Sequence, residues 1–190
     1  VKAGFTHVGS DHEAHGYTVI GNTDMKDSEA TTRCAVDFLN ERNRSSKPFY
    51  LDVGYLETHR TEWVCHGYSR EHDDPKDGHG NPGYVMPPPV FADRPETRRD
   101  WLDYRHSVER LDRHYGRILD ALEANGLADD TLILATTDHG LPKPDMKGKL
   151  TGHGTGVLQI IRFPRGMGMG QVIDGLVSHL DFFPNLCQLL

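Results

Sequence analysis

The sequence predicts an α/β fold in which a mixed, largely parallel sheet is flanked by helices, and three observations support this. Helix-like periodic segments alternate with short runs of strand-forming residues along the 190 residues. The run at 130–137 is continuously apolar at its centre, as expected of a strand buried on both faces. Two strand runs end in titratable side chains, which is typical of ligand sites at the carboxyl ends of strands.

The first third of the chain predicts a loop, a helix and a strand. Residues 1–24 have no clear periodicity, so we expect a loop with at most one short strand. A helix is predicted at 27–44, where Asp27 or Ser28 can cap the N-terminus and apolar residues recur every four positions. The run at 47–56, rich in aromatic and branched residues, predicts a strand.

An irregular stretch then separates this strand from a long helix. Residues 57–95 are dense in Gly, Pro, Asp and His, and loops beyond about 15 residues are usually functional or disordered. We expect the part at 63–94 to influence substrate choice. A helix is predicted at 97–125, ended by Asn125-Gly126. The remaining predicted elements are strands at 130–137, 157–164 and 176–180 and a helix at 181–190, capped by Asp181.

Composition narrows the possible partners. The net charge is -7 and no Lys/Arg block offsets it, which argues against a nucleic-acid partner. No run approaches the ~20 apolar residues that span a bilayer. The three cysteines, Cys34, Cys65 and Cys187, are widely spaced and odd in number, so they predict neither a disulfide framework nor a zinc site. Oligomeric state is left open.

Candidate site residues follow two strands that are neighbours in the predicted order. Glu57 and His59 follow the first, and Asp138 and His139 follow the run at 130–137, so the two strand ends could converge on one crevice. Asp138 offers hard oxygen for Ca²⁺ or Mg²⁺. His139 could add a nitrogen ligand or cap the following turn. Taken alone, Asp-His-Gly after a strand is more typical of turn chemistry.

Three lysines, Lys143, Lys147 and Lys149, precede the next strand. A lysine returning toward an Asp-bound metal suggests an anionic substrate, because the ammonium would neutralise its oxygens. The alternative is a solvated basic loop.

Four segments together resemble the sulfatase family of the alkaline-phosphatase-like superfamily. They are KPFYLDVGYLETHR, DTLILATTDHGLPKP, KGKLTGHGTGVLQIIRFPRG and LVSHLDFFPNLCQLL, in the family's order and spacing. Pro142 and Pro144 after the Asp-His-Gly element are similar to the branch of heparan N-sulfatase-like (sulfamidase-like) enzymes. The resemblance covers the chain from about Asp27 onward and implies an alkaline-phosphatase-like fold.

The resemblance also implies roles for four residues. Asp138 and His139 match a pair that helps to hold an active-site Ca²⁺, with Mg²⁺ less favoured. Lys147 matches a basic residue that contacts the sulfate, and His59 matches a histidine that also touches it. Thr58 stands where the family usually has proline. His59 has two alternatives, as proton donor to the leaving group or as a structural histidine.

The family's nucleophile is a formylglycine made from Cys or Ser in a C/S-x-P/A-S-R pattern. None of the three cysteines matches this pattern, and neither does Ser69-Arg70. We therefore expect residues 1–190 to be a fragment of a single sulfatase-type catalytic domain, lacking its N-terminal part and C-terminal subdomain and inactive alone.

The resemblance implies that the parent protein cleaves an O- or N-sulfate of a small molecule or glycan by a metal-assisted formylglycine mechanism. It further implies a periplasmic, secreted or lysosomal protein. Two alternatives remain: a phosphate or phosphonate ester hydrolase of the same superfamily, or a degenerate homologue without catalysis. An unmodified Thr or Ser nucleophile would favour the first, and a complete chain without the pattern would favour the second.

Overall fold

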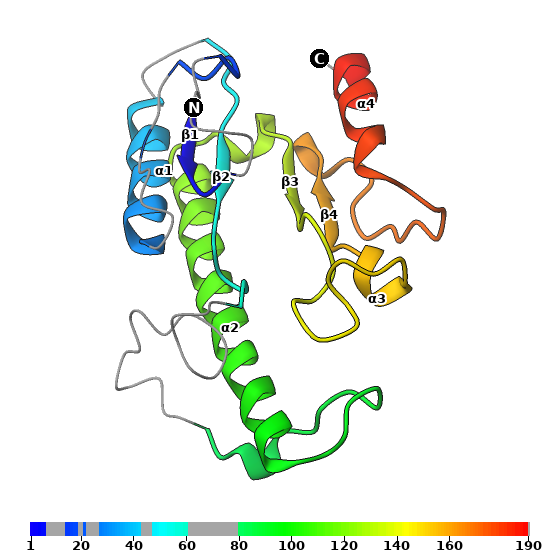
Figure 1. Ribbon diagram of the computed structural model, residues 1–190. Helices are drawn as coiled ribbons and strands as arrows, with labels where there is room; N and C mark the ends of the chain where they lie inside the picture. The colour runs from blue at the N-terminus through cyan, green and yellow to red at the C-terminus, as the bar shows by residue number, and fades with distance from the viewer. Residues whose placement is uncertain (7–13, 19–20, 22–26, 43–46, 61–79, 190) are drawn as a thin grey trace.

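The computed structural model describes residues 1–6, 14–18, 21, 27–42, 47–60 and 80–189, and its helices and strands alternate (Figure 1). The strands are β1 (Lys2–Gly4), β2 (Asp52–Gly54), β3 (Ile133–Thr136) and β4 (Gln159–Arg162). The α-helices are α1 (Ser28–Arg42), α2 (Pro95–Ala124), α3 (Gly152–Thr155) and α4 (Phe182–Leu189). None of these helices is long and apolar enough to cross a membrane.

The described strands form one parallel and one antiparallel pair. β1 pairs in parallel with β2, with Lys2 opposite Asp52, and β3 pairs antiparallel with β4, with Ile133 opposite Arg162. Both strand orientations therefore occur, as expected of a mixed sheet. The residues of β3 are only half-buried, which differs from the prediction of a strand buried on both faces. The physical reason is that β3 has β4 as its one partner within the described ranges.

The ends of the two long helices follow from local chemistry. Asp27 caps α1, because its Oδ1 accepts a hydrogen bond of 2.7 Å from the N–H of Ala30. α2 begins at Pro95, two residues before the predicted start, because proline fits the first turn of a helix. It ends where Gly126 adopts a left-handed φ of 65° and the N–H of Leu127 donates to the carbonyl of Leu122 at 2.9 Å.

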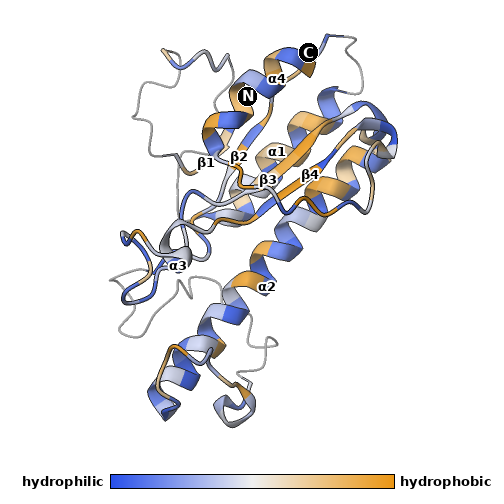
Figure 2. Ribbon diagram, turned by 90° about the vertical axis from the view of Figure 1, so that its right-hand side faces the viewer, coloured by the Kyte–Doolittle hydropathy of each residue, from blue (hydrophilic) through white to orange (hydrophobic). Residues whose placement is uncertain are grey.

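Two apolar clusters pack along α2. The first lies between α1 and the C-terminal half of α2 and consists of Leu39, Ala121, Leu122 and Ala128. The second lies at the N-terminal half and consists of Val85, Trp101 and Leu102. Figure 2 shows that α2 itself carries apolar and polar residues in alternation, whereas β3 is largely hydrophobic. The helix thus contributes residues to both clusters.

The end of the irregular stretch before α2 is ordered. A 3₁₀ turn at Pro82–Tyr84 precedes Val85, which is buried against the second cluster. The end of this stretch is therefore packed rather than structureless. Its central part, 61–79, includes Cys65 and the Ser69-Arg70 pair and lies outside the described residues.

The predicted strand at 176–180 is wrong. Ser178 instead begins a 3₁₀ turn at His179–Asp181 that leads into α4. The hydroxyl of Ser178 accepts from the N–H of Leu180 at 3.3 Å, and its own N–H donates to Asp181 Oδ2 at 2.8 Å. This reciprocal capping box starts a helical segment, and it outweighs the strand propensity of the preceding Leu and Val.

A buried polar network joins α1, α2 and the end of β2. The hydroxyl of Thr32 lies 2.7 Å from His114 Nδ1 and 2.8 Å from the hydroxyl of Tyr55. The Tyr55 and His114 rings are stacked with centroids 5.5 Å apart. Burial lowers the pKa of His114 below its usual value of 6.5, and the charges of Glu57 and Glu29 oppose this.

We expect the protein to lose stability as the pH falls below about 6.5, because the unfolded His114 binds a proton that the folded one resists. The sign follows from linkage: the unfolded state holds more protons in that window, so stability rises with pH. Urea unfolding at several pH values measures the slope. His114→Gln should reduce the slope, and His106→Gln on the same helix should retain it. An unchanged slope in His114→Gln would exclude His114 as a source of it.

Candidate active site

Two residues 88 positions apart in the chain meet at the centre of the candidate site. Lys147 Nζ lies 3.1 Å from His59 Nε2. His59 follows β2, and Lys147 belongs to the loop between β3 and α3 (Figure 1). Because the ammonium group can only donate, His59 Nε2 accepts this hydrogen bond and carries no proton. The two residues that were expected to face an anion are thus already side by side.

A tight turn presents His59. Its N–H donates to the carbonyl of Leu56 at 2.8 Å, and Thr58 adopts a left-handed φ of 65° within the turn. A positive φ at the third turn position is the geometry of a type II turn, which normally selects glycine. In a β-branched residue this conformation is a true outlier and costs about 1–2 kcal/mol. The turn after β2 therefore holds backbone strain next to the candidate site.

The pKa of His59 is lowered from its usual value of 6.5. Burial is the largest cause, and the neighbouring charge of Lys147 acts in the same direction. His139 lowers the pKa further, whereas a hydrogen bond to the Arg60 backbone and the charge of Asp138 raise it. All of these groups therefore lie within electrostatic reach of His59. At neutral pH the imidazole is uncharged, and the positive charge of the pair resides on Lys147.

Asp138 and His139 lie directly after β3 and are oriented toward each other. His139 Nδ1 lies 2.7 Å from the carbonyl oxygen of Gly140, so Nδ1 donates this hydrogen bond and Nε2 is the nitrogen that faces Asp138. His139 Nε2 lies 3.6 Å from Asp138 Oδ1. Two ligands at right angles, each about 2.4 Å from a cation, are about 3.4 Å apart. The donor pair therefore fits two adjacent positions around one divalent ion.

The pair fills only part of a coordination sphere. Within the described ranges, no group of three or more His, Cys, Asp or Glu side chains gathers. A Ca²⁺ ion takes about six to eight oxygen ligands. The Asp138 side chain is 67% exposed, which leaves its carboxylate accessible to such an ion.

Gly140 allows the lysine loop to return close to the end of β3. Its N–H donates to the carbonyl of Gly154 at 3.0 Å, so the end of the lysine loop returns to the end of β3. A Cβ atom at position 140 would lie 1.9 Å from the carbonyl oxygen of His153, a distance that no side chain tolerates. Glycine is required for this close approach of two backbone segments.

The three lysines of the loop differ in environment. Lys149 is exposed, and Lys147 faces His59. Lys143 is buried, with a side chain only 1% exposed that forms an ion pair with Asp100 on α2. Its ammonium lies 4.7 Å from the ring centre of Trp101. Burial lowers the pKa of Lys143, and Asp100 opposes this effect. Lys143 therefore points toward α2 and does not face the candidate site. This differs from both expectations for the lysines, a solvated basic loop and direct contact with an anion.

Asp100 also contacts the residue after His59. Arg60 Nη1 lies 3.1 Å from Asp100 Oδ1 and 3.2 Å from Oδ2. Sequence reasoning singled out neither Asp100 nor Arg60. Asp100 lies in the polar first turns of a helix with many acidic residues, so no local pattern distinguished it.

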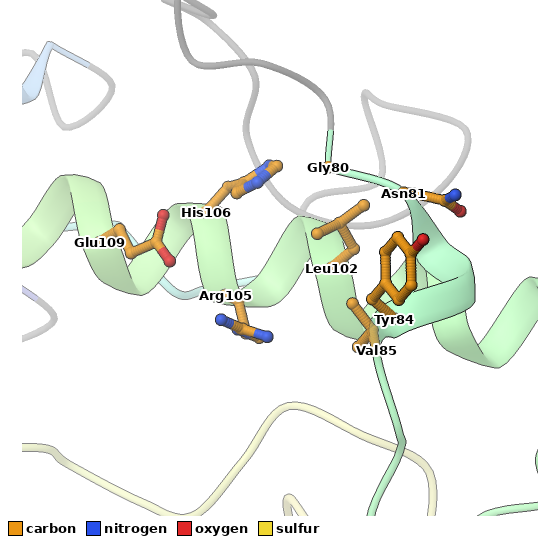
Figure 3. Close-up of a pocket in the computed structure, with 8 residues that line it drawn as sticks. All are labelled: Gly80, Asn81, Tyr84, Val85, Leu102, Arg105, His106 and Glu109. Atoms are coloured by element: carbon orange, nitrogen blue, oxygen red, sulfur yellow. The ribbon is translucent and has the colours of Figure 1, made fainter.

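A cavity of about 250 Å³ lies elsewhere on α2 (Figure 3). It is lined by Leu102, Arg105, His106 and Glu109 of the helix and by Gly80, Asn81, Tyr84 and Val85 of the preceding stretch. In Figure 3 His106 and Glu109 lie on one side and Tyr84 on the other. None of the four predicted site residues lines this cavity, so it is separate from the candidate site.

Comparisons with known proteins agree on one family. The family model described as Sulfatase matches residues 3–190. The chain is 30% identical to the ulvan-active sulfatase of Formosa agariphila over 103 residues, which cover 54% of this chain and 17% of that protein. It is 27% identical to human N-sulphoglucosamine sulphohydrolase over 161 residues, which cover 76% of this chain and 32% of that protein. The chain thus spans a third or less of the length of these relatives.

Solved structures share the fold. A structure described as Ps i-CgsB in complex with k-i-k-neocarrahexaose has a TM-score of 0.59 at 23% identity, covering 85% of this chain and 33% of that one. A second, described under the metabolism of multiple glycosaminoglycans by Bacteroides thetaiotaomicron, has a TM-score of 0.63 at 24% identity, covering 85% of this chain and 35% of that one. The predicted α/β, alkaline-phosphatase-like class is thereby confirmed as an incomplete part of that fold.

Proposed function

The chain belongs to the sulfatase family, whose model it matches from residue 3 to residue 190, and we propose on this premise that it is part of the catalytic domain of a sulfuric ester hydrolase. The whole protein cleaves an O- or N-sulfate, and its substrate is a sulfated small molecule or glycan. Residues 1–190 supply one side of the site. The formylglycine nucleophile comes from another part of the protein, since no matching pattern occurs in these residues.

One observation carries this proposal: the contact between Lys147 Nζ and His59 Nε2 at 3.1 Å. Two segments that the family resemblance had assigned to the same anion converge, although they are 88 residues apart. A lysine held beside a neutral imidazole offers N–H groups and positive charge to a tetrahedral oxyanion. Asp138 and His139 lie close enough to affect the pKa of the same imidazole.

Members of the family generally bind a divalent metal, and Asp138 and His139 are the residues of this chain that would hold it. We assign Ca²⁺, in keeping with the carboxylate of Asp138, with the other ligands drawn from elsewhere in the protein. The bound ion supplies positive charge that stabilises the negative charge developing on the sulfate.

The chain's own residues bind and orient the sulfate. Lys147 donates from its ammonium group to a sulfate oxygen, which requires it to turn partly away from His59. His59 then has two uses. A bound anion raises the pKa of a nearby imidazole by favouring its protonated form, and a protonated His59 can donate to a sulfate oxygen or to the leaving group.

Two of the matched proteins support a glycan as substrate. One is described as ulvan-active, and one solved structure contains k-i-k-neocarrahexaose. Membership of the family accords with a periplasmic, secreted or lysosomal location.

The test is hydrolysis of 4-nitrophenyl sulfate and of 4-nitrophenyl phosphate by the complete protein, before and after treatment with a chelator. We expect turnover of the sulfate ester at least 100-fold above that of the phosphate ester, loss of turnover after chelation, and recovery on adding Ca²⁺. A preference for the phosphate ester would instead favour a phosphate or phosphonate ester hydrolase. No turnover of either ester by metal-loaded protein would favour a degenerate homologue.

A further inference from the structure

We propose that Asp100 is a positioning residue that aligns His59 with Lys147, an inference that rests on the proposed function of this pair. Asp100 does not act by direct contact with either member of the pair. It binds instead to Arg60, which follows His59, and to Lys143, which precedes Lys147 by four residues. One carboxylate on α2 thus ties together the two segments that supply the anion site.

The tie to the lysine loop is rigid. Lys143 Nζ bonds to the Asp100 carboxylate and is covered by the rings of Trp101 and Tyr104, with centroids 4.7 and 5.8 Å away. A side chain that is 1% exposed and paired with a carboxylate has few alternative positions. Lys143 therefore fixes one point of the loop on α2.

From this point the backbone carries the constraint to Lys147. The N–H of Met146 donates to the carbonyl of Lys143 at 3.1 Å, and the N–H of Lys147 donates to the carbonyl of Leu141 at 3.2 Å. Met146 is itself buried, with 3% exposure. The turn from Leu141 to Lys147 is therefore closed by its own hydrogen bonds and anchored through two buried side chains.

The connection from Asp100 to His59 passes through a single residue, Arg60, which follows His59 in the chain. Arg60 Nη1 lies within 3.2 Å of both carboxylate oxygens of Asp100. The N–H of His59 is held by Leu56 on the other side. The histidine backbone is thus fixed from both directions, and its imidazole reaches Lys147 from a defined position. Displacing catalytic groups by about 1 Å costs on the order of 100-fold in rate.

The experiment uses the complete protein and compares Asp100→Asn combined with Lys143→Met in two backgrounds, wild type and Lys147→Ala. The paired substitution is chosen because Asp100→Asn alone removes the negative charge beside a buried ammonium, which would destabilise the fold. Each protein is checked by thermal unfolding. The readouts are kcat and KM for 4-nitrophenyl sulfate and the Kd of inorganic sulfate by calorimetry. Asp112→Asn, at an exposed position of the same helix, is the matched control.

In the wild-type background we expect the paired substitution to lower kcat about 10-fold to 100-fold and to raise the sulfate Kd about 5-fold. In the Lys147→Ala background the same substitution should change both quantities much less than in the wild-type background, because only the part of its effect that acts through His59 is left. Equal losses in both backgrounds, or no loss in either, would overturn the positioning role.

Failure of the proposed function gives a different pattern. A protein that binds sulfate without hydrolysing its esters would contradict the hydrolase, and the sulfate Kd values would still decide the role of Asp100. A protein that neither binds sulfate nor hydrolyses its esters would overturn both.

Discussion

Asp138→Ala is expected to lower kcat for sulfate ester hydrolysis by the complete protein by about 10³-fold, equivalent to about 4 kcal/mol in the barrier. In the proposed metal site, the carboxylate of Asp138 at the end of β3 supplies a hard oxygen ligand to the divalent cation. Its loss removes a negatively charged ligand from beside His139, the other proposed ligand. Steady-state kinetics across a range of Ca²⁺ concentrations measures the effect.

The fold should survive this change. The Asp138 side chain is 67% exposed, so its removal creates no cavity. Asp129→Ala is the matched control, because Asp129 is exposed and lies before β3 rather than after it. It should leave both kcat and the Ca²⁺ dependence unchanged. Undiminished turnover by Asp138→Ala, in protein shown to be folded, would remove Asp138 from the metal site.

Lys147→Ala is expected to reduce kcat/KM for sulfate esters by about 10²–10³-fold, as is typical when one charged donor to a developing oxyanion is lost. The substitution also removes a positive charge that lowers the pKa of His59. The pKa of His59 should therefore rise, and the basic limb of the pH profile, where the proton of His59 is lost, should move to higher pH. Measuring kcat/KM from pH 5 to pH 8 tests both effects together.

Two further substitutions separate charge from position. Lys147→Arg keeps a cation at the same place and should retain much more activity than Lys147→Ala. Lys149→Ala removes an exposed lysine two residues away and should leave kcat/KM unchanged. Equal activity of Lys147→Ala and Lys149→Ala would show that the loop contributes only general positive charge.

Local patterns predicted the elements that local chemistry controls. The helix starting after Asp27 and the helix ending at Asn125-Gly126 follow from capping groups that act within a few residues, so their sequence signals were sufficient. The stretch at 176–180 has strand-like composition, and there the prediction failed because the Ser178–Asp181 capping box starts a helical turn. The burial of β3 was overestimated. A continuous apolar run shows that a strand can be buried, but it does not show how many strands or helices pack against it.

The candidate site was predicted only in part. His59, Lys147, Asp138 and His139 were chosen from strand ends and family resemblance, and the structure brings the first two into contact. Their roles remain predictions. Asp100, Arg60 and the burial of Lys143 could not be predicted, because each depends on which side chain meets which across separate elements. An ion pair between residues 43 positions apart leaves no periodic trace in a sequence.

The strained turn at Thr58 has a consequence for exchanging residues between this chain and its relatives. Proline, the usual residue of the family at this place, is confined to a φ near −65°, whereas Thr58 has a φ of 65°. The two residues therefore require φ angles of opposite sign at this position. A Thr58→Pro graft would reverse the turn and redirect the imidazole of His59 unless its neighbours changed too. Positions 56–59 should therefore be exchanged together. Replacing Thr58 alone would change the turn conformation, whereas exchanging the whole turn would preserve the placement of His59.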